Sequence, residues 1–247
     1  MVNVHIHEFA SGKAAIDEAA LALFHRQWTA YQKLVDGDFL SHAAVARILH
    51  EVLVERFDGP FAFLDIACGD ASLAKKALAG TSVRHYQGID LAAPALELAA
   101  KTLEDACYDV DLDHRDYVKA LGERTQHADA VWCGLSIHHF ETPEKLRLFR
   151  EIRSVTGDGG IFLLYEPVLG EGEDLKAYLA RTWATVPARW VTLTGEEIEQ
   201  LREHIDTCDL PESAEGWLEL GRQAGFTRAD QIFADPLNLY RMFRFEP

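Results

Sequence analysis

The sequence contains little cysteine and little methionine, and its basic residues are far fewer than its acidic ones. Its 247 residues include 4 cysteines and 2 methionines, with 24 lysines and arginines against 40 aspartates and glutamates. No two cysteines stand close together and none belongs to a C-x-x-C motif; they are Cys68, Cys107, Cys133 and Cys208. Such spacing is typical neither of a disulfide framework nor of a thiolate zinc site. We therefore expect reduced thiols and a cytoplasmic protein.

Long apolar runs and a basic leader are also missing from the sequence. No apolar run approaches the roughly 18 residues that a membrane span needs, and the N-terminus lacks a basic segment followed by an apolar one. The formal net charge of −16 disfavours approach to phosphate backbones and to anionic membranes. These observations predict a protein that binds neither nucleic acid nor a membrane.

The composition is that of a folded chain, 48% hydrophobic, with neither an internal repeat nor a low-complexity segment. A chain of this length can form one large domain, or one domain with a small cap, and bury roughly 70% of its unfolded surface. Strand and helix patterns alternate along it, which predicts an α/β fold with a doubly wound parallel sheet and helices on both faces. The expected strands are residues 61–66, 83–90, 108–114, 128–134 and 161–165, with helices at 71–79, 94–105 and 143–155 and a turn at 157–160.

The first strand and the turn after it read F-A-F-L-D-I-A-C-G-D-A-S over residues 61–72. Asp65 lies at the C-terminal end of that strand, the edge at which open α/β sheets bind ligands. Ala67, Gly69 and Ala71 then take every second position of the turn. Such small residues let a ligand approach the backbone and the first N–H groups of the next helix. The pattern predicts a binding site for a nucleotide-like molecule.

A second acid follows at the end of the next strand. The run V-R-H-Y-Q-G-I-D ends at Asp90, 25 positions after Asp65. In a doubly wound sheet, an acid at this place lies beside the first turn and can accept hydrogen bonds from both hydroxyls of a ribose. A hydrogen bond to a charged group contributes roughly 1.5–3 kcal/mol, so the two acids together favour a nucleoside ligand.

The turn resembles the first motif of the class I S-adenosylmethionine-dependent methyltransferases. That motif is an acid followed by three glycines at alternate positions. It falls on residues 65–71, where the middle glycine is kept and Ala67 and Ala71 replace the outer two. The resemblance covers about residues 60–166 well and 214–246 in outline. It implies a Rossmann-like, seven-stranded sheet, mostly parallel with a C-terminal antiparallel strand, and S-adenosylmethionine as the cofactor, with S-adenosylhomocysteine as the product.

The resemblance also implies roles for individual residues. Asp116 would accept a hydrogen bond from the adenine amino group, and Tyr117 would pack on the ring. Gly134 begins the segment G-L-S-I-H-H-F, whose His138 and His139 are candidate general bases because the pKa of histidine lies near neutrality. A packing or hydrogen-bonding role for these histidines stays open. The residues expected at the cofactor are Asp65, Ala67, Cys68, Gly69, Asp90, Leu91, Asp116, Tyr117, Gly134, Leu135 and Tyr31.

The parts of the chain outside the cofactor motifs are where we expect substrate choice to lie. Residues 1–58 are predicted to form a helical lid, and residues 59–247 the methyltransferase domain, with a helical insertion at 168–213 that contributes to the substrate cap. Trp28 and Tyr31 are placed at the lid, where a cation–π contact to a sulfonium is one role. The alternative is that both aromatic residues pack the helix onto the core.

The predicted function is transfer of the methyl group of S-adenosylmethionine to a small molecule with an oxygen, nitrogen, sulfur or carbon nucleophile. The acidic excess makes a cationic or amine acceptor one hypothesis. Methyl transfer from a sulfonium needs no metal, and no ligand cluster is visible in the sequence, so no metal site is expected. Three alternatives stay open: methylation of a partner protein, cofactor binding without catalysis, and an NAD-dependent oxidoreductase. Against the last, G-x-G-x-x-G would need glycine where Ala67 and Ser72 stand. A homodimer also stays open.

Overall fold

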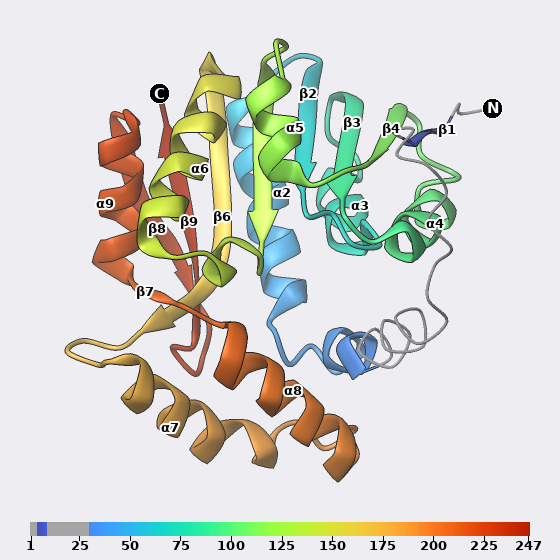
Figure 1. The fold of residues 1–247 in the computed structure, drawn as a ribbon. Helices are drawn as coiled ribbons and strands as arrows, with labels where there is room; N and C mark the ends of the chain where they lie inside the picture. Colours follow the sequence, from blue (N-terminus) through green and yellow to red (C-terminus); the bar gives the residue numbers. More distant parts are fainter. Residues whose placement is uncertain (1–3, 9–29) are drawn as a thin grey trace.

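The computed structural model describes the backbone of residues 4–8, and residues 30–247 apart from the side chain of Pro187. Its strands are β1 (Val4–Glu8), β2 (Phe61–Ile66), β3 (Val83–Asp90), β4 (Asp109–His114), β5 (Ala128–Gly134), β6 (Thr156–Leu169), β7 (Glu212–Ser213), β8 (Arg228–Ala234) and β9 (Tyr240–Glu246). They form one sheet in the order β1-β4-β3-β2-β5-β6-β9-β8, with β7 paired to β6 (Figure 1).

The topology confirms the predicted Rossmann-like α/β fold. Strands β4, β3, β2, β5 and β6 pair in parallel, and β9 pairs antiparallel with both β6 and β8. The strands expected at 83–90 and 128–134 have the predicted limits. Two strands were not predicted, because their pairing partners are distant in sequence: β1 pairs in parallel with β4, and β7 pairs in parallel with β6.

Helices cover both faces of the sheet (Figure 1). On one face lie α2 (His42–Arg56), α3 (Ser72–Leu78) and α4 (Ala93–Thr102), and on the other lie α5 (Tyr117–Glu123), α6 (Thr142–Val155) and α9 (Ala214–Ala224). Successive side chains of a strand point to opposite faces. On β2, Phe61 and Phe63 accordingly pack in the core beneath α2, α3 and α4, whereas Leu64 and Ile66 pack beneath α5, α6 and α9.

The turn expected at residues 157–160 is wrong, because β6 runs through it. Thr156 on β6 pairs with Ala128 on β5, and Ile161 pairs with Ala130. Residues 157–160 of β6 therefore lie opposite a single residue of β5, so β6 bulges here. Glycine makes this bulge feasible, since a Cβ on Gly160 would stand 2.9 Å from the carbonyl oxygen of Asp129. Gly160 therefore relieves a close approach between the two strands.

A helical cap lies at the end of the sheet where the parallel strands have their carboxyl ends (Figure 1). It consists of helical residues 30–36, α7 (Leu175–Thr185), the short η2 (Val186–Ala188) and α8 (Gly195–Cys208). The first helix expected in the lid, including Trp28, lies mostly outside the described residues; its end at 30–36 is helical. The cap has its own apolar core, made of Ala30, Leu34, Leu40, Tyr178, Val186, Trp190, Leu193 and Leu239.

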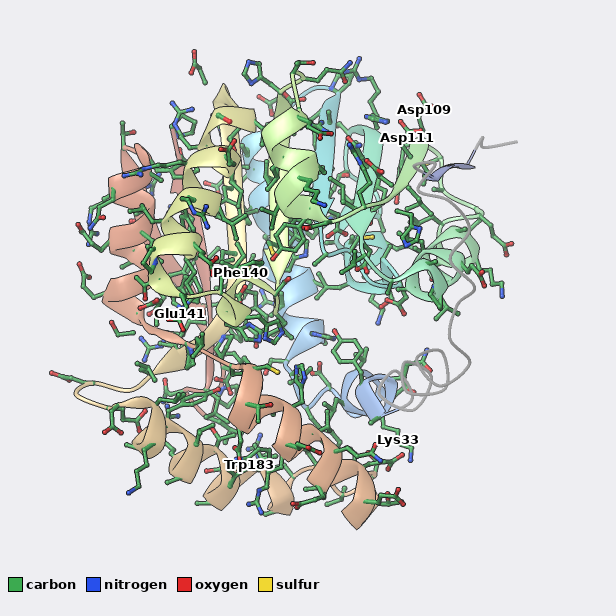
Figure 2. All side chains as sticks on the ribbon, viewed as in Figure 1. Lys33, Asp109, Asp111, Phe140, Glu141 and Trp183 are labelled. Atoms are coloured by element: carbon green, nitrogen blue, oxygen red, sulfur yellow. The ribbon has the colours of Figure 1, made fainter. Side chains whose placement is uncertain are left out.

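Polar contacts hold the parts of the cap together. Thr194 and Glu197 form a capping box at the start of α8, each accepting a hydrogen bond from the other's backbone N–H. Glu197 also pairs with Lys33 at 2.6 Å, which ties α8 to the N-terminal helical residues. Trp183 on α7 donates from its indole N–H to Asp206 on α8 at 2.7 Å. Lys33 and Trp183 are labelled in Figure 2, both within the cap.

Among the described residues, no helix combines the length and the apolar composition needed to cross a membrane. All four cysteines are free, as their spacing predicted.

Candidate functional site

A cavity of about 280 Å³ lies where β2, β3 and β5 end, under the cap. Its floor is the turn between β2 and α3, and Asp65, Asp90 and Gly134 contribute the three strand ends. Tyr31 from the cap and His42 from the first turn of α2 also line it. The cavity therefore lies at the place where a doubly wound sheet binds its ligand.

The backbone of the turn explains its small residues. Ala67, Gly69 and Ala71 have φ angles of 55°, 55° and 58°, so all three lie in the left-handed region. That region costs a residue with a Cβ roughly 1–2 kcal/mol, while glycine enters it freely. A glycine would be unstrained at each of the three positions, and alanine is the smallest side chain that can replace it.

Asp90 holds the turn from the neighbouring strand. Its Oδ2 accepts a hydrogen bond from the N–H of Gly69 at 2.9 Å, and its Oδ1 accepts one from the N–H of Ala92 at 2.8 Å. Burial raises the pKa of this carboxyl, while the hydrogen bonds from backbone N–H groups lower it again. Leu91 also contributes a backbone hydrogen bond, and since a carboxylate offers about four lone-pair positions, at least one remains for a ligand.

Asp65 is a buried acid at the back of the cavity, with 2% of its surface exposed. The hydroxyl of Tyr86 donates to its Oδ2 at 2.8 Å. Burial raises the pKa of Asp65 to about 8; the bond from Tyr86 opposes this, and the charges of Asp90 and Asp70 add to it. A cation in the cavity would favour the ionised form of Asp65.

A second cavity of about 140 Å³ lies between the end of the sheet and the cap. Most of its lining is apolar and includes Leu34, Leu40, Pro167, Trp190, Leu201 and Ile205. Polar side chains line it as well: His138, His139, His204, Asp209 and Tyr240. Tyr31, Leu135 and His139 line both cavities, so the two spaces adjoin.

Leu135 stands at this junction with a strained backbone. Its φ of 55° lies in the left-handed region, which is unusual for a bulky side chain. Its N–H donates to the carbonyl of Tyr165 on β6 at 2.8 Å, which helps to hold the conformation. Strain of this kind is found at ligand-binding sites, where the surrounding structure maintains it.

His138 and His139 belong to the short η1 (Ile137–His139) that follows β5. His138 is 5% exposed, and its Nδ1 lies 2.5 Å from Oε2 of the fully buried Glu166. Burial by itself lowers the pKa of His138, but the carboxylates of Glu166 and Asp209 outweigh it and raise that pKa to about 9. Burial and the neighbouring His138 lower the pKa of His139.

A comparison with protein families identifies the domain. Residues 63–160 match the family described as methyltransferase domain. This match is consistent with a class I S-adenosylmethionine-dependent methyltransferase. It supports S-adenosylmethionine as the cofactor. No curated protein sequence matches the chain.

Solved structures share the fold of this methyltransferase domain. An O-methyltransferase family protein from Burkholderia thailandensis is similar with a TM-score of 0.64 and 15% identity, over 94% of this chain and 60% of that one. The mitomycin 7-O-methyltransferase MmcR has a TM-score of 0.59 and 15% identity, over 94% and 58%. PigF, solved with SAH, has a TM-score of 0.52 and 19% identity, over 75% and 50%. The chain thus spans between 50% and 60% of the length of these structures.

The first cavity fits S-adenosylmethionine. The free lone pairs of Asp90 suit the hydroxyls of a ribose, and the left-handed turn lets a ligand approach the backbone. Asp65, Asp70 and Asp90 all line the cavity and complement the positive charge of a sulfonium. These residues of the methyltransferase domain would hold the cofactor.

The structure brings together most of the residues that the sequence assigned to the cofactor. Those that line the first cavity are Asp65, Ala67, Cys68, Gly69, Asp90, Gly134, Leu135 and Tyr31. Three others are not among its lining residues. Leu91 is 70% exposed, Asp116 caps α5 by accepting from the N–H of Val118 at 2.9 Å, and the hydroxyl of Tyr117 bonds to that of Ser136 at 3.1 Å.

Other residues of the site were not found from the sequence. Glu166 carried a signal, since it directly follows the strand predicted at 161–165, at the same edge of the sheet as Asp65. His42 and Asp209 carried none, because each comes from a helical segment far from the motifs and reaches the site only through the fold. Burial lowers the pKa of His42 to about 4, so the cofactor cavity contains a neutral imidazole at neutral pH.

Proposed function

We propose that this protein transfers the methyl group of S-adenosylmethionine to a hydroxyl group of a small, largely apolar molecule. The observation that carries the proposal is the junction of the two cavities at Tyr31, Leu135 and His139. A donor in the first cavity and an acceptor in the second would meet at that junction. Methyl transfer requires this, because the reacting atoms have to be held in line about 3–3.5 Å apart.

The second cavity supports a small acceptor. It lies beneath the cap, and another cavity of about 180 Å³ adjoins it, since Tyr31, Leu201 and His204 line both. Such enclosed apolar spaces with a few polar groups at one end are typical of small-molecule sites. The name of MmcR, a mitomycin 7-O-methyltransferase, also favours a small molecule with an oxygen nucleophile.

The residues at the junction would hold the acceptor and take its proton. S-adenosylmethionine supplies a methyl group that its sulfonium already activates. The acceptor oxygen forms a bond to the methyl carbon while the bond from that carbon to sulfur breaks, and the hydroxyl proton passes to a base. His139 lines both cavities and its pKa is lowered, so it is the first candidate for that base. His138 lines the second cavity, but with its pKa raised to about 9 it would have to lose a proton before it could act as the base.

The test is transfer of labelled methyl from S-adenosylmethionine to a panel of small hydroxyl, amine and thiol acceptors. The parent, His138→Ala and His139→Ala are compared, with His85→Ala on β3 as a control outside both cavities. We expect label only in hydroxyl acceptors, and a kcat about 10²–10⁴-fold lower in at least one of the first two variants. Label in a protein band or in amines alone would contradict the acceptor class. Unchanged kcat in both variants would discard the base.

A further inference from the structure

Three potential metal ligands converge at the edge of the second cavity. They are His138 and His139 on η1 and Asp209, which follows α8. One ligand atom from each lies within 4.8 Å of the others. Oδ1 of Asp209 is 3.4 Å from Nε2 of His138 and 3.6 Å from Nδ1 of His139.

Asp209 lacks a hydrogen-bond partner for one of its oxygens. The residue is 8% exposed, and its Oδ1 is buried and makes no hydrogen bond to any described residue. Its distances to the two imidazoles exceed the 2.7–3.2 Å of an ordinary N–H···O bond. A buried oxygen without a hydrogen bond costs about 1–3 kcal/mol, and more when it is charged. The imidazole of His138 offsets part of this cost by its charge, and a metal ion bound directly to Oδ1 would remove it.

Glu166 orients the first imidazole toward the same point. Its Oε2 lies 2.5 Å from Nδ1 of His138, and its Oε1 accepts hydrogen bonds from the N–H groups of Ile137 and Ser136 at 2.7 and 3.2 Å. The contact with Glu166 fixes Nδ1 as the donor nitrogen, so Nε2 is the atom of His138 that faces Asp209, at 3.4 Å. A metal ion bound there would displace the proton that Nε2 carries in the doubly protonated imidazole. Histidines that bind a metal through one ring nitrogen usually donate a hydrogen bond from the other, often to a carboxylate.

The two separations from Asp209 are close to those of a tetrahedral site. Bonds of about 2.0–2.1 Å from a zinc ion to nitrogen and oxygen place two ligand atoms about 3.3 Å apart. The distances from Asp209 Oδ1 to His138 and His139, 3.4 and 3.6 Å, are close to that value. His139 has one competing contact, in which its Nδ1 lies 3.3 Å from the carbonyl oxygen of Cys208. A bond from a metal ion to that nitrogen would replace this long hydrogen bond.

We propose that His138, His139 and Asp209 bind one divalent transition-metal ion of the zinc type. Two imidazoles and one carboxylate leave at least one coordination position open, as in catalytic zinc sites. All three residues line the second cavity, so an acceptor in that cavity lies next to the ion. The ion would favour loss of the proton from an acceptor hydroxyl. This last consequence rests on the proposed function, whereas metal binding itself does not.

The experiment is a metal titration of tag-free protein treated with a chelator. Zn²⁺ binding is measured by calorimetry, and Co²⁺ binding by its visible absorption, which reports ligand geometry. Asp209→Asn and His138→Gln test the site. His85→Gln is the matched control, because His85 also pairs with an aspartate, Asp111, at 2.9 Å. A double variant, His5→Gln with His7→Gln, controls for the N-terminal histidines.

We expect one equivalent of Zn²⁺ per chain in the parent and in both controls. The affinity for Zn²⁺ should fall by at least about 100-fold in Asp209→Asn and in His138→Gln. Substitution of residues that only hydrogen-bond to metal ligands already lowers metal affinity 10–100-fold. Thermal unfolding and S-adenosylmethionine binding show that each variant is folded.

No stoichiometric binding by a folded parent that binds S-adenosylmethionine overturns the proposal, as does equal affinity in a folded Asp209→Asn. In either case the negative charge of Asp209 would be balanced by protonated imidazoles alone. Stoichiometric Zn²⁺ without methyl transfer to any acceptor would leave the metal site standing and contradict the proposed function.

Discussion

The carboxylate of Asp90 and the N–H of Gly69 form a hydrogen bond of 2.9 Å that links the end of β3 to the turn after β2. The same carboxylate is the group predicted to accept hydrogen bonds from the cofactor ribose. One side chain therefore shapes the turn and offers its remaining lone pairs to the ligand.

Asp90→Ala should weaken S-adenosylmethionine binding by roughly 10- to 150-fold, which corresponds to the 1.5–3 kcal/mol of a hydrogen bond to a charged group. Calorimetric titration with S-adenosylmethionine and S-adenosylhomocysteine checks this, with NADH as the ligand control. Asp109→Ala, an exposed residue at the start of β4 (Figure 2), should bind both ligands as the parent does. Binding of NADH alone would contradict the assigned cofactor.

Ala67→Gly should not destabilise the protein and should raise the free energy of unfolding by up to about 1 kcal/mol. Relief of the left-handed strain at φ 55° offsets the greater freedom of glycine in the unfolded chain. The control is Ala79→Gly, at an ordinary φ of −59°, which should lower that free energy by about 0.4–1 kcal/mol. Urea unfolding without cofactor measures both variants. Equal losses would refute the strain argument.

Asp65→Asn should make the free energy of unfolding less dependent on pH. The folded pKa of Asp65, about 8, exceeds its unfolded value, so the folded state keeps a proton that the unfolded state releases. Its contribution to stability is complete below about pH 4 and is lost as the pH rises to about 8, by at most about 1.4 kcal/mol per pH unit. Asparagine removes this proton equilibrium and can still accept from Tyr86.

The measurement is urea unfolding of parent and Asp65→Asn at pH 5, 6, 7 and 8. All other titrating groups are common to both proteins, so the difference between the two curves isolates Asp65. Parallel curves would mean that Asp65 is ionised in the folded state throughout this range.

Tyr165→Phe should lower the free energy of unfolding by about 1–3 kcal/mol and loosen the cap. The hydroxyl of Tyr165 on β6 donates to the buried carbonyl of Leu40 at 3.0 Å, and phenylalanine leaves that carbonyl without its partner. Tyr108→Phe is the control, since the Tyr108 hydroxyl makes no hydrogen bond to any other described residue. Thermal unfolding of the two variants is compared. A smaller loss for Tyr165→Phe than for Tyr108→Phe would contradict the tie between sheet and cap.

The sequence by itself determined the parallel sheet and the cofactor turn. Apolar runs, the acids that end them and the small residues of the turn are local features, and local periodicity and turn chemistry are enough to locate them. For this reason the strands at 83–90 and 128–134 have the predicted limits, and Asp65 and Asp90 line one cavity.

Only the tertiary structure decided what surrounds the acceptor cavity. Asp209 meets His138 because the insertion folds back over the end of the sheet, and no spacing in the sequence encodes that contact. The segment 157–160 forms a bulge within β6 and does not end the strand, because the strand on either side of it pairs with β5. Contacts between distant segments depend on the packing of whole elements, so residues such as Asp209 and His42 enter the site only once the chain has folded.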